Sequence, residues 1–209
     1  MPKDHHDRTD TSPARYSADI AAGSLLLPES RKIAQLLLNE VKKVGWHRAI
    51  VLDNVLQKRS PDTARRQARL IRNRLRIMTA DHWKMVRDGS SELATQALLA
   101  SAIKQSRLLA DYMDHVLRQH VRTFESHLKT EEWSRFLEAC EQLDPAVASW
   151  SETTTKKLRQ VIIRILAEAR YLENTRSRKL TPVSVIPGLK DYLLEHQEHA
   201  ILRCMEIYP

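Results

Sequence analysis

Apolar residues recur every three or four positions along most of the chain, the spacing that places them on one face of an α-helix. The pattern predicts a first helix that starts at Leu27-Pro28 and is stopped by Gly45, then a short helix over about 46–56. Further helices are expected over 61–77, 79–89, 91–124 with one break near 104–106, 130–143 and 151–172, with one or two more before the end. The chain is therefore predicted to be all-α.

Two segments stand outside this helical pattern. Residues 1–15 are polar, charged and aperiodic, which is typical of a flexible N-terminal tail. Residues 176–186 form a basic turn followed by a β-prone run that prolines interrupt, so this segment leaves room for one short β wing. The remaining helices are expected to form a compact multi-helix protein of two small lobes, an N-terminal lobe over 16–90 and a C-terminal lobe over 91–209.

Composition excludes several other classes of protein. Only 4 Gly and 8 Pro are present, too few for glycine-rich phosphate loops or a turn-rich all-β fold. No apolar run approaches the roughly 18–20 residues of a membrane span, and the N-terminus lacks the apolar core of a signal peptide. Cys140 and Cys204 show no CxxC spacing and are expected to be buried thiols. These features predict a cytoplasmic protein.

The positive charge of the chain is unevenly distributed. The net charge is +8, yet residues 1–110 hold 20 Lys and Arg against 11 Asp and Glu, while residues 111–209 hold 14 against 15. The whole excess lies in the first half of the chain. Such a localised basic surface favours a nucleic-acid partner.

Most of this charge gathers in the predicted helix over 61–77. Ser60 is a favourable N-cap and Pro61 suits the first helical turn. At 100° per residue, an apolar face forms within about 40° of Ala64 and consists of Ala64, Ala68, Ile71, Leu75 and Met78. Beside it, at about 80° to 140°, one stripe is formed by Arg65, Arg69, Arg72 and Arg76. Arg66 and Arg74 are expected elsewhere on the exposed surface.

The arginine stripe is unfavourable for an isolated helix, because like charges four residues apart repel each other. Arginine also forks onto phosphates and base edges. We therefore interpret the stripe as a surface for a polyanion, most readily DNA. The alternatives are a solvated helix face, or arginines that pair with acidic residues from the second half of the chain.

The elements around the stripe follow the order of a helix-turn-helix motif: a short helix over 46–56, a turn over 57–60 and the basic helix. In that motif the second helix enters the major groove with its N-terminal residues at the bases. The candidate DNA-binding residues are Lys58, Arg59, Ser60, Thr63, Arg65, Arg66, Arg69, Arg72 and Arg76. A possible second DNA site combines Lys156, Lys157, Arg159, Arg178 and Lys179, for which a solvated surface is the alternative.

Catalytic chemistry is not apparent in the sequence. It contains no GxSxG, HExxH or P-loop motif, and its histidines are scattered. Glu195, His196, Glu198 and His199 have spacing that could bind a metal, but a solvated terminal helix is the favoured interpretation. We therefore expect a non-enzymatic protein without a metal or cofactor.

Several segments of the sequence resemble corresponding segments of the BrxA family. They are the run from Tyr16 to Ala34, the segment Asn54–Ser60 followed by Thr63-Ala64, the stretch Leu75–Ser91, and Ser151–Leu172 with Thr153, Leu158 and Arg159. The resemblance covers most of residues 16–172. It offers no catalytic motif, so the basic residues named above rest on helical geometry alone.

The resemblance implies an accessory protein of a BREX bacteriophage-defence system that binds double-stranded DNA. It further implies a NusB-like helical domain and work alongside the methyltransferase, ATPase and phosphatase-like components of such a system. Two alternatives stay open, a protein–protein scaffold within the defence complex and an RNA-binding, NusB-like protein.

Overall fold

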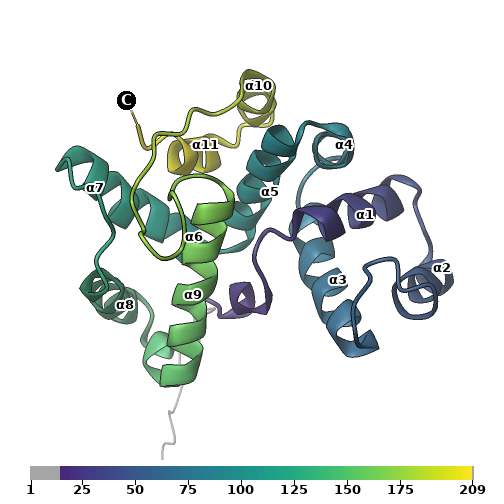
Figure 1. The fold of residues 1–209 in the computed structure, drawn as a ribbon, viewed down its shortest axis with the longest axis horizontal. Helices are drawn as coiled ribbons and strands as arrows, with labels where there is room; N and C mark the ends of the chain where they lie inside the picture. The colour runs from purple at the N-terminus through teal and green to yellow at the C-terminus, as the bar shows by residue number, and fades with distance from the viewer. Residues whose placement is uncertain (1–14, 209) are drawn as a thin grey trace, which may run out of the picture.

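The computed structural model describes residues 15–208 and confirms an all-α architecture (Figure 1). The α-helices are α1 Leu27–Leu38, α2 Lys43–His47, α3 Pro61–Arg76, α4 Ala80–Asp88, α5 Ser91–Gln105, α6 Arg107–Asp111, α7 Arg118–Arg122, α8 Glu131–Leu143, α9 Glu152–Glu168, α10 Pro187–Glu195 and α11 His199–Met205. Shorter helical turns of other types are η1 Asp19–Ala22, η2 Arg48–Leu52, η3 Tyr112–Leu117 and η4 Pro145–Ser149.

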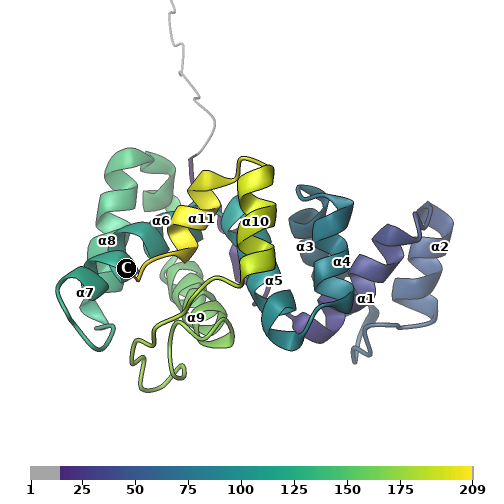
Figure 2. The same cartoon turned by 90° about the horizontal axis from the view of Figure 1, so that it is seen from above.

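Helix α5 lies between two groups of helices (Figures 1 and 2). It packs against α1, α3 and α4 on one side, and against α6, α10 and α11 on the other. Its middle is buried on all sides from Ala97 to Ile103, as expected for a helix without a polar face. The predicted lobe boundary at residue 90 coincides with the α4–α5 connection. However, one continuous apolar core, running from Tyr16 to Ile207, joins the two halves.

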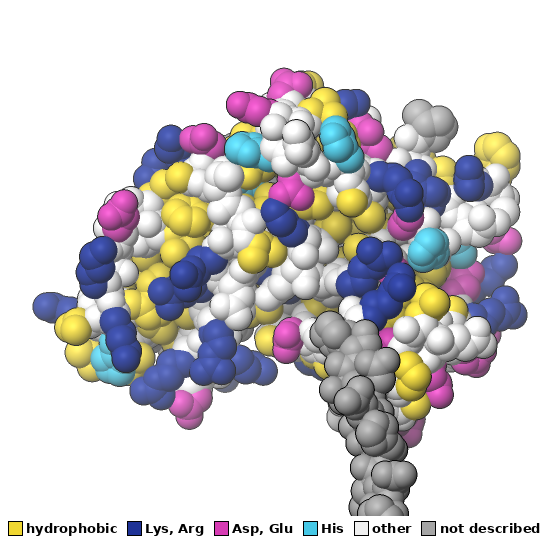
Figure 3. All heavy atoms as spheres, turned by 180° about the vertical axis from the view of Figure 1, so that it is seen from behind, with side chains coloured by type: hydrophobic (Ala, Val, Ile, Leu, Met, Phe, Trp, Pro, Cys, Tyr) yellow, Lys and Arg dark blue, Asp and Glu magenta, His cyan; other side chains and the backbone are white. Residues whose placement is uncertain are grey.

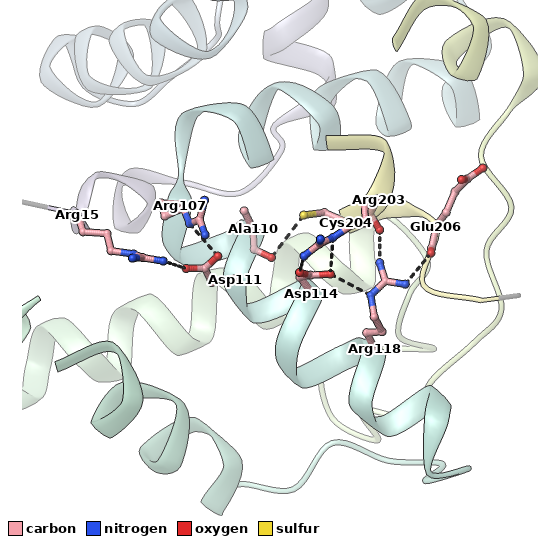
Figure 4. A network of polar contacts seen from close by, with 9 residues as sticks. All are labelled: Arg15, Arg107, Ala110, Asp111, Asp114, Arg118, Arg203, Cys204 and Glu206. Carbon is pink, nitrogen blue, oxygen red and sulfur yellow. Dashed lines mark hydrogen bonds and ion pairs between the residues drawn. The ribbon is translucent and has the colours of Figure 1, made fainter. Parts of the chain in front are cut away.

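The first described segment ties the two halves together. The buried Tyr16 donates its hydroxyl hydrogen to Asp111 Oδ2 at 2.8 Å and its backbone N–H to Asp144 Oδ2 at 2.9 Å. The following turn η1 packs against both α9 and α3. Arg15 lies 3.8 Å from the same Asp111 carboxylate (Figure 4). The rest of the predicted flexible tail, residues 1–14, lies outside the described residues.

The predicted boundary of the first helix is wrong. Helix α1 ends at Leu38, and Glu40 adopts a left-handed conformation with φ 50°. The Glu40 N–H bonds the Leu37 carbonyl at 2.9 Å and the Val41 N–H bonds the Leu36 carbonyl at 3.1 Å, which is the Schellman arrangement of a helix end. Gly45, the predicted stop, lies inside α2. The helix end was missed because Glu40, rather than a glycine, occupies the left-handed position.

The later breaks follow the sequence more closely. Helix α5 ends at Gln105, and the Ser106 Oγ caps α6 by accepting from the Leu109 N–H at 3.3 Å, which confirms the predicted interruption. The β wing is not formed: residues 15–208 contain no strand, and the 176–186 segment makes two isolated bridges, His127 with Lys179 and Leu172 with Leu180. Pro182 lies two residues after Leu180 and has no N–H with which to extend a ladder.

Candidate nucleic-acid interface

Helix α3 is built as its sequence predicts. The Ser60 Oγ accepts from the Thr63 N–H at 3.3 Å, which caps the helix before Pro61. The predicted apolar face is buried, since Ala64, Ala68, Ile71, Leu75 and Met78 all belong to the core. These residues pack against α1, α5 and η2. Burial of this face therefore fixes which side of α3 meets solvent.

The buried arc of α3 is wider than the apolar face. Leu70 and Arg74, at about 240° and 280° from Ala64, are also buried. The open arc of about 80–200° then carries Arg65, Arg66, Arg69, Arg72 and Arg76, of which only Arg72 is partly buried. The open side of the helix is thus mainly guanidinium, and Figure 3 shows Lys and Arg gathered at the end of the molecule formed by α2 and α3.

A groove runs between this arginine surface and the preceding helices. It has a volume of about 350 Å³ and is lined from α2 and η2 by Lys43, Trp46, His47, Ile50 and Val51, and from α3 by Arg65, Ala68, Arg69, Arg72 and Asn73. The groove has an apolar floor and basic walls. Such a groove can hold an anionic backbone against apolar side chains.

Trp46 organises one wall of the groove. The guanidinium carbon of Arg72 lies 4.5 Å from the centre of the Trp46 ring, a cation–π contact. Stacking leaves the edge of the guanidinium available for hydrogen bonds, because the ring meets only its face. The Trp46 side chain also packs partly against the core. The sequence did not identify Lys43 and Trp46 as site residues, because no local pattern shows that their side chains reach the arginine surface of α3.

Several predicted contact residues are already engaged within the protein. The Lys58 ammonium forms a largely buried ion pair with Glu29 of α1, so Lys58 would have to leave this pair to contact a phosphate. Ser60 and Thr63 bond each other at the cap, with 3.0 Å between their hydroxyl oxygens. Arg65 pairs with Asp62 at 2.8 Å, although both side chains remain well exposed. Arg59 stays exposed at the end of the connection.

The predicted bounds of the helix-turn-helix elements are wrong, because the helical run expected over 46–56 ends at Leu52. The connection between η2 and α3 runs from Asp53 to Ser60, eight residues, where the motif has three or four. Asn54 organises this connection, since its side chain accepts from the Lys58 N–H at 3.0 Å and donates to the Lys58 carbonyl at 2.9 Å.

Arg74 is not on the surface, contrary to our expectation. It is 2% exposed and donates to the Ser24 carbonyl at 2.6 Å, to the Gly23 carbonyl at 3.1 Å and to Gln105 Oε1 at 3.1 Å. Burial lowers the pKa of Arg74 to about 10, while the nearby Glu168 carboxylate raises it. The guanidinium is therefore charged at neutral pH and holds α3 against the N-terminal segment and α5.

The second predicted basic site is only partly assembled. Lys156 and Lys157 are exposed on the first turns of α9, and Arg159 is half-buried. Arg178 bonds the Thr130 hydroxyl at 3.0 Å and thereby contacts the start of α8. Burial strongly raises the pKa of Tyr112, and Arg159 and Arg178 both oppose this, so the two guanidinium groups lie near the same tyrosine. Lys179 bridges to His127 through its backbone.

Comparison with known proteins identifies the family. The BrxA family model matches residues 14–197. The chain belongs to the BrxA family. The BREX protein BrxA of Paramagnetospirillum magneticum is 45% identical over 92% of this chain and 97% of its own length, and that of Escherichia coli O9:H4 is 31% identical over 91% and 90%. A crystal structure of an uncharacterized protein from Magnetospirillum magneticum, 42% identical, superposes with a TM-score of 0.87 over 93% of this chain and all of that one.

Residues 15–208 contain no group of three or more His, Cys, Asp or Glu side chains arranged to hold a metal ion. Cys140 and Cys204 are both buried and unpaired with each other, as predicted. Burial raises the pKa of each thiol to about 11, which keeps both in the unreactive protonated form. Within the same residues, no helix is long and apolar enough to cross a membrane.

Proposed function

We propose that this BrxA-family protein is a non-enzymatic subunit of a BREX bacteriophage-defence system that binds double-stranded DNA through α3. One observation carries the proposal: the open side of α3 presents five arginines beside an apolar-floored groove. Among the described residues only Arg65 of these five forms an ion pair with an acidic side chain. This favours an external anion over pairing within the chain.

The length of the arginine surface suits a nucleic-acid backbone. From Arg65 to Arg76 the helix rises about 16 Å, at 1.5 Å per residue. Phosphates of one DNA strand advance by about 3.4 Å along the duplex axis, so the surface spans roughly five of them. Guanidinium groups bind phosphate in a forked, two-bond geometry, and positioning through phosphates needs no base contact. We therefore assign α3 to backbone contact, with the groove receiving one strand.

The test measures how binding depends on salt. Each phosphate contact contributes about −0.9 to the slope of log affinity against log salt concentration. Replacing the three exposed arginines Arg65, Arg69 and Arg76 by alanine should reduce the magnitude of that slope by about 2 to 3. Arg72 is kept, because its stack on Trp46 supports the groove. Mobility-shift titrations at several salt concentrations give both slopes.

A matched control removes the same charge elsewhere. Arg135, Arg164 and Arg170 are exposed in the second half of the chain, outside both candidate sites. Their replacement by alanine should leave the slope of log affinity against log salt concentration within about 1 of the slope measured for the parent protein. Equal losses in the two triple variants would show that net charge, and not α3, determines binding. The same titration of a Lys156→Ala, Lys157→Ala double variant tests separately whether the start of α9 also contacts DNA.

The same titration separates the alternatives. We propose duplex DNA as the ligand, so an RNA hairpin of equal length should compete less well than duplex DNA. Preferential competition by RNA would instead support the RNA-binding, NusB-like alternative. Micromolar DNA binding that ignores the α3 substitutions, together with salt-resistant association with other BREX components, would support the scaffold alternative. Work alongside the methyltransferase, ATPase and phosphatase-like components remains part of the proposal.

A further inference from the structure

A second groove lies where α7, the 180–182 segment and the C-terminal segment meet, at the opposite end of the molecule from α2 and α3 (Figures 1 and 2). Its volume is about 700 Å³. Its lining is mainly apolar and includes Val121, Phe124, Leu180, Pro182, Ile207 and Tyr208. We call this surface the Phe124 groove. An open apolar surface of this kind is typical of a binding site for another molecule.

Phe124 is in a position that the fold itself does not explain. Its side chain is 95% exposed and its backbone is left-handed, with φ 56°. The Phe124 N–H bonds the Val121 carbonyl at 3.3 Å and the Glu125 N–H bonds the His120 carbonyl at 2.9 Å, so Phe124 occupies the left-handed position of a Schellman helix end. Glycine is preferred there because a side chain strains the backbone. A large apolar ring at this position adds strain and exposed apolar area to the free protein.

The opposite wall of the groove is held rigidly. Arg118 bonds Asp114 Oδ1 at 2.9 Å and the Glu206 carbonyl at 3.1 Å, and it also bonds the Arg203 carbonyl (Figure 4). These bonds fix the C-terminal segment that carries Ile207 and Tyr208. On the other side, the Leu180 N–H bonds the Ser126 carbonyl at 2.9 Å. The groove is therefore preformed, which reduces the entropy lost when a ligand binds.

The rim of the groove is positively charged. Glu125 is paired with Lys129 at 3.2 Å, and Glu206 with Lys190 at 2.7 Å, so both lining carboxylates are neutralised. Arg122 is exposed and forms no ion pair within residues 15–208. Arg122 therefore leaves an uncompensated positive charge beside the apolar lining. The complementary ligand has an apolar side chain with a negative charge next to it.

We propose that the Phe124 groove binds a short segment of a partner protein in which an apolar side chain is flanked by acidic residues. Phe124, Ile207 and Tyr208 would receive the apolar side chain, and Arg122 the acidic flank. The N-terminal residues 1–14 of this chain are a poor match, because they contain no aromatic, Leu, Ile or Val residue. The surface is separate from α3, so the proposal does not depend on DNA binding.

The test uses phage-displayed random 12-residue peptides selected on the full chain, followed by fluorescence anisotropy with the enriched peptides. We expect enrichment of sequences that place Leu or an aromatic residue beside Asp or Glu. Phe124→Gly should weaken their binding at least tenfold while raising Tm, because glycine relieves the left-handed backbone. Arg122→Glu should weaken the acidic peptides at least fivefold. A purely structural role for Phe124 would lower Tm instead.

Leu143→Ser is the matched control, since Leu143 is another exposed apolar residue, at the end of α8. It should leave peptide binding unchanged.

Failure to enrich peptides, or equal binding to the parent and to Phe124→Gly, would overturn the proposal. Light scattering that shows a dimer abolished by Phe124→Gly would also overturn it, in favour of a second copy of the chain. Displacement of the peptides by duplex DNA would reassign the groove to nucleic acid. Unchanged peptide binding in the α3 triple variant keeps the outcome independent of the DNA-binding test.

Discussion

Arg74 provides a direct test of how the arginine helix is held in place. Its guanidinium donates three hydrogen bonds, to Ser24, Gly23 and Gln105, from a position that is 2% exposed. The Glu168 carboxylate completes the cluster by accepting from the Ser24 hydroxyl at 2.7 Å and from the Leu25 N–H at 2.9 Å. Arg74→Met keeps much of the side-chain volume and removes every one of the three bonds.

The expected loss can be estimated from the contacts. Each hydrogen bond to a charged group contributes about 1.5–3 kcal/mol, and removing one partner of a buried charge cluster costs about 3–5 kcal/mol. We take about 3–5 kcal/mol, because the methionine recovers some packing while Glu168 and two backbone carbonyls lose their cation. For a chain of this length, that loss corresponds to a fall in Tm of roughly 6–20 °C.

Urea unfolding followed by circular dichroism measures this change, with a lower midpoint at an unchanged slope as the expected result. Arg66→Met is the control on the same helix, because Arg66 is exposed, and its effect should stay within about 0.5 kcal/mol. Arg74→Met combined with Glu168→Gln should lose less than the sum of the two single changes, since the two groups share one cluster. A loss below about 1 kcal/mol for Arg74→Met would refute the reasoning.

Three other buried groups, one histidine and two cysteines, give predictions with a clear direction. Burial lowers the pKa of His82 to about 4 from its ordinary 6.5, although its hydrogen bond to the Ala97 carbonyl opposes this. Between those values the unfolded chain binds a proton that the folded chain does not, so up to about 3 kcal/mol of stability is lost as pH falls from 6.5 to 4. Urea midpoints at pH 7, 5.5 and 4.5 should fall less steeply for His82→Gln than for the parent, and equal steepness would contradict this origin. Cys140 and Cys204 have raised pKa values and buried sulfurs, so a disulfide reagent at pH 7.5 should label them only as fast as the protein opens. Immediate labelling of either thiol in the folded protein would contradict their burial.

The all-α character of the chain, the start of α3 and the face of α3 that enters the core could be predicted from the sequence. Ser60 and Pro61 mark the start of α3, and the spacing from Ala64 to Leu75 marks its buried side. Both signals arise from interactions within three or four residues along the chain, so they can be recognised in the sequence before the tertiary structure is known. The same local geometry predicted that Arg65, Arg69, Arg72 and Arg76 share one stripe. Where the left-handed helix end lacked a glycine, at Glu40, the local signal failed.

Only the tertiary structure decided which charges reach solvent and what lies beside them. Arg74 differs little from Arg66 in sequence context, but its neighbours Gly23 and Ser24 are about fifty residues away. Trp46 enters the groove because α2 packs against α3, and Phe124 faces a groove because the C-terminal segment returns to α7. The physical reason is the same in each case. Desolvation and pairing depend on groups that are distant in sequence, and helical periodicity carries no information about them.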